Sequence, residues 1–352
     1  MPAMNGSAVS FRKGRLIGCC MAVVLVFAAL FASSASAAKA PLTPTNYTAL
    51  GDSLAFGYTA EKHAINEPSE PPAAFEEGYT NFLVAKLAKL EKKEGNQLSL
   101  INMGCPGELS DGMIGENKAL GGGGEGNGKP DSEPCAYNNV WPLHFEIGAA
   151  SQLEAAIGVV TTPGTFGATK LVTENIGSND ELAVVHACAT PAYDAAHGFA
   201  TFEICLFHEA GEEGYYYSGG IFKHIITNLG DAIGVLRNFG YTGPVVVLGF
   251  YNPQSFILPG SDILQELLNS HLGGAISAGA FGPGVIFANP FPKFNPQKQK
   301  AEKKAIAKYT EECNPNVQNF QTGNAPGCEG DIHPTVAGYK LLAKVIYQAL
   351  GH

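Results

Sequence analysis

Segments with the character of buried strands alternate with amphipathic helical segments along this chain. The strand-like segments are residues 46–50, 98–103, 169–176, 244–250 and 285–288. The helical patterns cover residues 79–93, 151–160, 218–238, 262–280, 298–312 and 335–350. Such alternation predicts a parallel sheet with helices on both faces, because parallel strands are joined by crossover helices. We find no internal repeat and no clear linker, so the sequence predicts one domain.

The composition favours a folded, acidic protein. Apolar residues make up 45% and charged residues 15% of the 352 residues, which is enough for a substantial core. The formal net charge is −10 and no basic patch stands out, so nucleic acid is not an expected partner. We expect a monomer.

The N-terminus has the pattern of an export signal. Three basic residues lie between positions 12 and 15, an apolar run covers 16–32, and Ala35-Ser36-Ala37 is a small-residue cleavage site. The alternative is a membrane anchor, because the run is nearly long enough to span a bilayer. Small residues follow at once and no basic stop-transfer cluster does, which favours a signal peptide at 1–37, a mature domain at 38–352 and a secreted protein.

Six cysteines remain after removal of that signal. An even number in an exported chain predicts three disulfides, although six cysteines allow 15 connectivities. No C-x-x-C or H-x-x-x-H spacing supports zinc instead. The cysteines fall into three pairs of sequence neighbours, and we favour the pairings Cys105–Cys135, Cys188–Cys205 and Cys313–Cys328.

A serine stands immediately after the first predicted strand. Residues 46–50 end at Gly51, and Ser53 and Gly57 follow just beyond the break. Open α/β sheets bind ligands at the carboxyl ends of their strands, so Ser53 lies where chemistry is expected. A serine becomes a nucleophile only when a base takes its proton and fixed donors hold the developing oxyanion.

His333 is the best candidate for that base. It lies in Asp331-Ile332-His333-Pro334, directly before the helix predicted at 335–350. An imidazole titrates near neutral pH and can both take and return a proton. The other mature histidines lie in predicted loops or on helix faces, and none of them precedes a proline at the start of a helix.

Two turns that follow predicted strands offer donors for an oxyanion. Gly107 follows the strand at 98–103, and no side chain blocks the approach to its backbone N–H. Asn179 follows the strand at 169–176, and its amide donates without carrying a charge. Together with the Ser53 N–H, these groups give three candidate donors.

At these positions the chain resembles the SGNH, or GDSL, hydrolase superfamily. The first block is matched by Gly51-Asp52-Ser53-Leu54 and the second by Asn102-Met103-Gly104-Cys105-Pro106-Gly107-Glu108. The third and fifth blocks are similar to Gly177-Ser178-Asn179-Asp180 and Asp331-Ile332-His333-Pro334-Thr335. Each motif alone occurs by chance in turns, but together, in family order over residues 47–340, they are specific.

The resemblance implies a fold and a set of roles. The fold is a flavodoxin-like three-layer α/β/α sandwich with a central parallel sheet. Ser53 is then the nucleophile, His333 the base, and Ser53, Gly107 and Asn179 the oxyanion donors. The six mature cysteines resemble those of exported actinobacterial members with three sequential disulfides. Neither a metal nor an organic cofactor is implied.

One position departs from the family pattern. The family usually places the catalytic acid three residues before the histidine, where this chain has Gly330. Asp331 lies two residues before His333 instead. Either Asp331 orients His333, or a backbone carbonyl near Glu329 or Gly330 does so, as in members with a Ser–His dyad.

These features predict a secreted serine esterase or lipase that cleaves a small-molecule or lipid ester through an acyl-enzyme. One alternative is a carbohydrate esterase that removes acetyl groups from a polysaccharide. Another is a catalytically silent secreted binding protein on the same fold. The aromatic segment 186–217 is either a lid or substrate wall, or an inserted subdomain with its own core. Residues 59–78 read as a surface loop.

Overall fold

The structure is a computed structural model that describes residues 41–66, 71–115, 143–145, 151–255, 260–312 and 331–352. The chain divides into two units, Met1–Pro41 and Leu42–His352, and the fold below is that of the second unit. The predicted signal peptide and Cys135, Cys313 and Cys328 lie outside the described residues.

Five parallel strands form the central sheet in the order β2-β1-β3-β4-β5. They are β1 (Thr43–Gly51), β2 (Asn96–Asn102), β3 (Ala168–Asn175), β4 (Val245–Leu248) and β5 (Val285–Ala288). This order is that of flavodoxin-like doubly wound sheets, so the predicted fold class is confirmed. The strand order changes direction between β1 and β3, because β2 lies on one side of β1 and the later strands lie on the other. In such sheets, ligands bind at the carboxyl ends of the two strands where the order changes direction.

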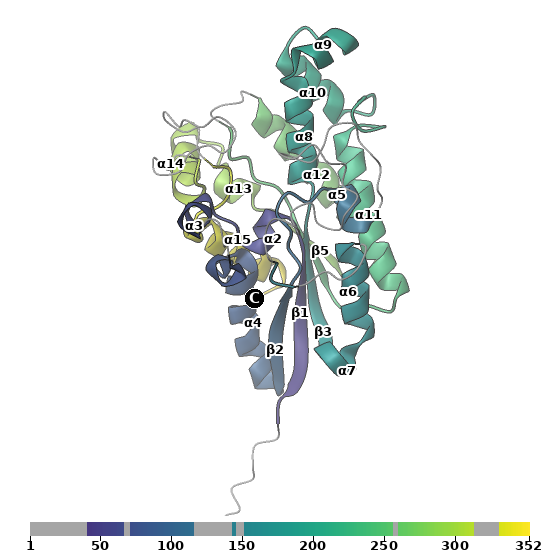
Figure 1. Cartoon of the computed structure of the whole chain (residues 1–352), viewed down its shortest axis with the longest axis vertical. Helices are drawn as coiled ribbons and strands as arrows, with labels where there is room; N and C mark the ends of the chain where they lie inside the picture. The colour runs from purple at the N-terminus through teal and green to yellow at the C-terminus, as the bar shows by residue number, and fades with distance from the viewer. Residues whose placement is uncertain (1–40, 67–70, 116–142, 146–150, 256–259, 313–330) are drawn as a thin grey trace, which may run out of the picture. The chain divides into compact units, whose positions relative to one another are not determined.

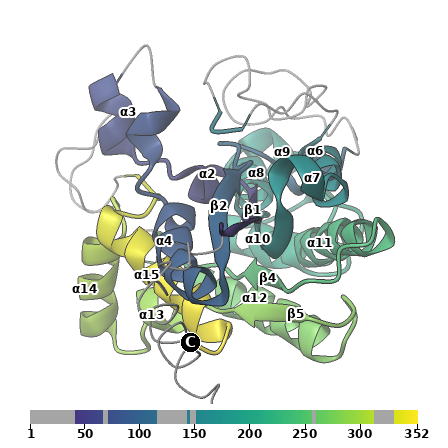
Figure 2. The ribbon, with the colours of Figure 1, turned by 90° about the horizontal axis from the view of Figure 1, so that it is seen from below.

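Helices cover both faces of the sheet (Figures 1 and 2). One face carries α4 (Tyr79–Glu91) and α15 (Val336–Ala349), together with α14 (Gln299–Tyr309). The other face carries α6 (Gln152–Thr161), α11 (Ile221–Asn238) and α12 (Ser261–Ser277). The result is a three-layer α/β/α sandwich. Shorter elements of the described part include η2 (Lys92–Glu94), α7 (Pro163–Phe166) and α13 (Phe291–Phe294).

Strand β4 shows why these residues form a buried strand. Its side chains alternate between the two helical layers, since successive residues of a strand point to opposite faces. Val245 and Val247 pack with the α6, α11 and α12 layer. Val246 and Leu248 pack with the α4 and α15 layer. All four are at most 2% exposed, and a strand buried on both faces needs this continuous apolar run.

Three helices begin at the carboxyl edge of the sheet: α2 (Ser53–Phe56), α5 (Ser110–Ile114) and α8 (Ser178–Cys188). Helix α8 continues into α9 (Pro191–His197) and α10 (Phe202–Ala210), which lie beyond that edge at the top of Figure 1. The disulfide Cys188–Cys205, with Cα atoms 5.6 Å apart, joins α8 to α10 and confirms that predicted pairing. Cys105 is also disulfide-bonded.

The loop predicted at residues 59–78 is wrong in part. Helix α3 (Ala60–Asn66) and the short η1 (Pro72–Phe75) lie within it. The N–H of Ala60 donates to Oε2 of Glu311 at 2.8 Å, a cap supplied from 251 residues away. The Thr59 hydroxyl accepts from Lys62 N–H at 3.1 Å. Within the described part of the chain, no helix is long and apolar enough to cross a membrane.

Candidate active site

Ser53 is the first residue of α2, directly after β1. The N-cap residue Asp52 accepts a hydrogen bond from Leu54 N–H at 2.9 Å, which starts the helix. Gly51 has φ of +141°, and a Cβ there would lie 2.2 Å from the carbonyl oxygen of Asn175. Only glycine fits this turn, so the sharp presentation of Ser53 depends on Gly51.

The structure brings Ser53, His333 and Asp331 together in one hydrogen-bonded chain. Nε2 of His333 lies 2.7 Å from the Ser53 hydroxyl oxygen. Nδ1 of His333 lies 2.5 Å from Oδ1 of Asp331. The same Asp331 oxygen accepts from the backbone N–H of His333 at 2.8 Å. Among the described residues, the partner of His333 Nδ1 is therefore Asp331, whereas residues 329 and 330 of the alternative lie outside the described part of the chain.

Asp331 and His333 shift each other's titration. Burial acts to raise the pKa of Asp331, but the His333 charge and two hydrogen bonds outweigh it and lower that pKa. Burial acts to lower the pKa of His333, but the Asp331 carboxylate outweighs it and raises that pKa. An ionised acid next to a more basic imidazole is the arrangement that a general base needs.

The loop that carries His333 is fixed by its backbone. The His333 carbonyl accepts from Glu311 N–H at 2.9 Å. The Ile332 carbonyl accepts from the Tyr251 hydroxyl at 3.0 Å. The Tyr58 ring packs against the imidazole with centroids 4.4 Å apart. These contacts hold the imidazole in the orientation that reaches Ser53.

The loop after β2 lies against α2. Cys105 N–H donates to the Gly51 carbonyl at 2.9 Å. A Cβ on Gly104 would lie 2.2 Å from Phe56 N, so the two backbones approach more closely than any side chain would allow. Gly107 follows with φ of +77°, a left-handed conformation that glycine adopts without strain. The predicted donor Gly107 therefore lies in a loop that is fastened beside Ser53.

The loop after β3 is bonded to the loop after β2. The Asn179 side-chain N–H donates to the Glu108 carbonyl at 2.9 Å. An amide has two N–H donors, so this bond fixes the side chain and leaves the second N–H for another acceptor. The two loops with candidate oxyanion donors thus share a direct contact.

A set of buried polar side chains joins these two loops to α11, and we call it the anchor network. Asp180 accepts from the N–H and the hydroxyl of Ser110, at 3.0 and 2.7 Å. The Asn228 amide donates to the Ser110 hydroxyl at 2.8 Å and to Asp111 at 2.9 Å. Nε2 of His224 lies 3.4 Å from Asp111 and 3.6 Å from Asp180.

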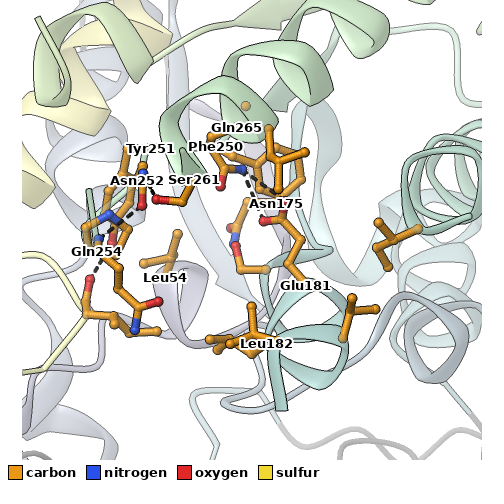
Figure 3. Close-up of a pocket in the computed structure, with 18 of the residues that line it drawn as sticks. Leu54, Asn175, Glu181, Leu182, Phe250, Tyr251, Asn252, Gln254, Ser261 and Gln265 are labelled. Atoms are coloured by element: carbon orange, nitrogen blue, oxygen red, sulfur yellow. Dashed lines mark hydrogen bonds between the residues drawn. The ribbon is translucent and has the colours of Figure 1, made fainter. Parts of the chain in front are cut away.

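An apolar pocket opens next to His333, between α8, α10, α11 and α12 (Figure 3). It reaches from Leu54 and His333 across the carboxyl ends of β3 and β4. Its apolar lining includes Ile176, Val185, Leu206, Ile221, Phe250 and Leu264. The predicted segment 186–217 supplies Leu206 and Ala210, so part of it is a pocket wall.

One polar pair interrupts this apolar lining. Glu181 from α8 and Gln265 from α12 point toward one another across the pocket in Figure 3. Nε2 of Gln265 donates to both carboxyl oxygens of Glu181, at 3.2 and 3.1 Å. Burial raises the pKa of Glu181 to about 8, and the nearby charge of Asp180 adds to that rise, while the Gln265 hydrogen bond opposes it.

Sequence reasoning missed the anchor network and the Glu181–Gln265 pair. It also missed Gln152, whose side-chain amide bonds both the N–H and the carbonyl of Gly51 at 3.0 Å. Each of these residues acts through a partner that is distant in sequence, and only Asp180 lies in a motif that the sequence shows, the Gly177-Ser178-Asn179-Asp180 block. Among the described residues, no group of three or more His, Cys, Asp or Glu side chains is placed to hold a metal ion.

No known family model matches the sequence, and no curated protein does. Several solved structures are similar in arrangement. The lipase Lip_vut3 from a goat rumen metagenome has a TM-score of 0.48 and 16% identity, covering 87% of this chain and 97% of its own.

Phospholipase A1 from Streptomyces albidoflavus has a TM-score of 0.43 and 15% identity, covering 86% and 98% of the two chains. A catalytic mutant of the acetylxylan esterase Axe2 from Geobacillus stearothermophilus has a TM-score of 0.41 and 10% identity, covering 89% and 96%. With each of these TM-scores below 0.5, the likenesses support no conclusion about the reaction of this chain.

Proposed function

We propose that this chain is a serine ester hydrolase of the SGNH, or GDSL, type. The observation that carries the proposal is the bonded chain from Ser53 through His333 to Asp331, with 2.7 Å between the Ser53 hydroxyl and the imidazole. A nucleophile, a base within hydrogen-bonding reach and a group that orients the base are the parts needed for acyl transfer.

In the proposed reaction, Ser53 Oγ attacks the ester carbonyl carbon while His333 Nε2 takes the hydroxyl proton. The Asp331 carboxylate holds Nδ1 and stabilises the imidazolium that forms. The Ser53 N–H, the Gly107 N–H and the Asn179 amide hold the oxyanion. His333 then protonates the leaving alcohol as the C–O bond breaks, and an acyl-enzyme remains. Water, deprotonated by His333, attacks that ester and releases the acid and Ser53.

The pocket favours an esterase or lipase over an acetyl esterase. An acetyl group needs only a small recess, whereas this pocket is lined by apolar side chains from α2, α8, α10, α11 and α12 and from the chain at the ends of β3 and β4. Burial of each methylene of a longer acyl chain contributes about 0.8 kcal/mol. The silent binding protein is disfavoured by the Ser53–His333 contact, which a protein without catalysis has no need to hold.

Hydrolysis of p-nitrophenyl esters from acetate to palmitate tests the proposal. We expect an optimum at a chain longer than acetate, and loss of turnover in Ser53→Ala. Acetylated xylan is the parallel substrate for the acetyl esterase alternative. If the wild-type chain and Ser53→Ala were equally inactive on all of them, the silent binding protein would become the better proposal.

We further propose that residues 1–37 are removed on export and that residues 38–352 act as one secreted, monomeric domain. The support is the basic, apolar and small-residue order of the first 37 residues, and the disulfide between Cys188 and Cys205. N-terminal sequencing of protein recovered from the medium tests the cleavage site. Light scattering tests the monomer.

A further inference from the structure

The apolar pocket beside His333 suits the acyl group of the substrate. In the proposed reaction the acyl group becomes bonded to Ser53 in the first step and stays until water releases it in the second, whereas the alcohol must leave to let water in. An apolar recess suits the part that stays. Leu54 and His333 line its near end, and Leu206 and Leu264 line walls that belong to α10 and α12.

The Glu181–Gln265 pair presents one free acceptor inside that recess. Both Glu181 oxygens accept from the same Gln265 nitrogen, so the Gln265 oxygen is directed away from the carboxyl group. Among the residues that the structure describes, no donor bonds that oxygen, and Gln265 Nε2 is the one hydrogen-bond partner of the Glu181 carboxyl.

The same pair presents a donor. Burial and the neighbouring Asp180 charge raise the pKa of Glu181, which favours the protonated carboxyl group, with an O–H to donate and no charge. A plain alkyl chain would leave this O–H and the Gln265 oxygen without partners in an apolar setting. A group that both donates and accepts one hydrogen bond, and that carries no charge, would satisfy both.

We propose that the Glu181–Gln265 pair binds a hydroxyl group on the acyl chain, so that the substrates are esters of hydroxylated fatty acids. This proposal rests on the proposed function, because it takes the ligand of this pocket to be the acyl group of an ester substrate. The competing explanation is structural: the pair only ties α8 to α12. If the pair binds a hydroxyl group, its removal changes ligand selectivity. If the pair is only structural, its removal changes stability and leaves selectivity as it was.

Binding to the full chain with Ser53→Ala tests the proposal without any need for turnover. The ligands are octanamide and its monohydroxy derivatives, with the hydroxyl at each carbon from the third to the eighth, measured by calorimetry. We expect one position of the hydroxyl to bind about tenfold tighter than octanamide. Adding Glu181→Leu or Gln265→Leu should abolish that preference.

Two further variants are matched controls. Glu181→Gln keeps an uncharged donor at the same place and should retain most of the preference. Val185→Ala trims the apolar lining on the same helix and should weaken octanamide and its hydroxy derivatives alike. A variant with unchanged selectivity and lowered stability would support the structural explanation.

Equal affinity for all the amides, absence of binding, or a preference that survives both leucine variants would overturn the proposal. If only the proposed function were wrong, the hydroxyl preference would persist in binding, and no p-nitrophenyl ester would be cleaved in a Ser53-dependent way.

Discussion

Asp180 and Glu181 are neighbours in the first turn of α8, yet their carboxyl groups have opposite surroundings. Asp180 is fully buried and accepts two hydrogen bonds from Ser110 within the anchor network. Glu181 faces the pocket and meets one amide. Successive residues point about 100° apart on a helix. One turn of α8 is therefore fastened to α5 by one carboxyl group and presents the next to the pocket.

The largest expected effect lies outside both of these carboxyl groups, at Asp331 beside His333. Asp331→Asn replaces an acceptor by an amide that favours the wrong imidazole tautomer, and we expect kcat to fall on the order of 10⁴-fold. The acid limb of kcat/KM should lie above the ordinary histidine pKa in the wild-type chain, because Asp331 raises the pKa of His333 and the base must be neutral. In Asp331→Asn that limb should move to lower pH.

Ester hydrolysis from pH 5 to 9 measures both effects. The matched control is Glu311→Gln, because Glu311 bears on His333 by charge and by its backbone N–H and not by a side-chain bond. A loss below tenfold in Asp331→Asn would instead mean that His333 is oriented mainly by its backbone contacts.

The next prediction compares the two carboxyl groups at the start of α8, those of Asp180 and Glu181. Asp180→Ala leaves the N–H and the O–H of buried Ser110 without their acceptor, although the Ser110 oxygen still accepts from Asn228, so we expect a loss of about 3 kcal/mol in the free energy of unfolding. Displacement of Asn179 should also lower kcat by on the order of 10²-fold. Glu181→Gln, one residue away, should change neither quantity by much, since it replaces a neutral group with another. Urea unfolding and ester kinetics on the two variants check this, and equal losses would remove the distinction drawn between them.

A smaller effect concerns the pocket wall. The Cys188–Cys205 bond closes a loop of 17 residues, and a link of that size stabilises by about 3 kcal/mol. Because it joins α8 to α10, its loss in Cys188→Ser/Cys205→Ser should loosen the wall that carries Leu206. We expect a higher KM for long-chain esters with acetate hydrolysis nearly unchanged. A uniform loss across chain lengths would show that the disulfide supports Ser53 and His333 as well.

The last effect concerns stability alone, and it separates a fully buried carboxyl group from one that faces the pocket. Glu174 on β3 is 0% exposed, and among the described residues neither of its carboxyl oxygens has a partner. Burial raises its pKa from 4.5 to about 8. The folded chain then keeps a proton that the unfolded chain releases, so stability falls as pH rises from about 4.5 to 8, by at most about 1.4 kcal/mol per pH unit.

Urea unfolding at several pH values measures that slope. Glu174→Gln should flatten it. Glu181→Gln should flatten the slope less, because Glu181 is only partly buried. A bound hydroxyamide should change the contribution of Glu181 to the slope and leave that of Glu174 unchanged. An unchanged slope in Glu174→Gln would mean that Glu174 ionises in the folded chain with nearly the pKa that it has in the unfolded chain.

The sheet could be predicted from sequence because its information is local. An apolar run such as Val245–Leu248 has few ways to be buried other than in a central strand, and a glycine such as Gly51 marks where the strand ends. Ser53 and His333 could be found for the same reason, since both stand at junctions between elements. Local patterns do not reveal helix caps or contacts that come from distant parts of the chain.

The parts that escaped prediction all depend on distant partners. Helix α3 is capped by Glu311, and Asn228 on α11 bonds residues of α5 that lie more than a hundred positions earlier. Whether Asp331 or a carbonyl would face His333 depended on the bend of a two-residue stretch, which the departure from the family spacing left open. The direction of Glu181 depended on where α12 docks.

Ser53 leaves the first strand of the chain, and His333 precedes its last helix, so the bond between them closes a circuit of 280 residues. A chain that ends before residue 333 carries β1, β2 and β3 and every candidate oxyanion donor, and still lacks the proposed base. The proposed site is therefore complete only after residue 333 has been made and the loop that carries it has docked beside Ser53. In the proposed secreted hydrolase, such late completion would spare the lipids of the cell that makes it.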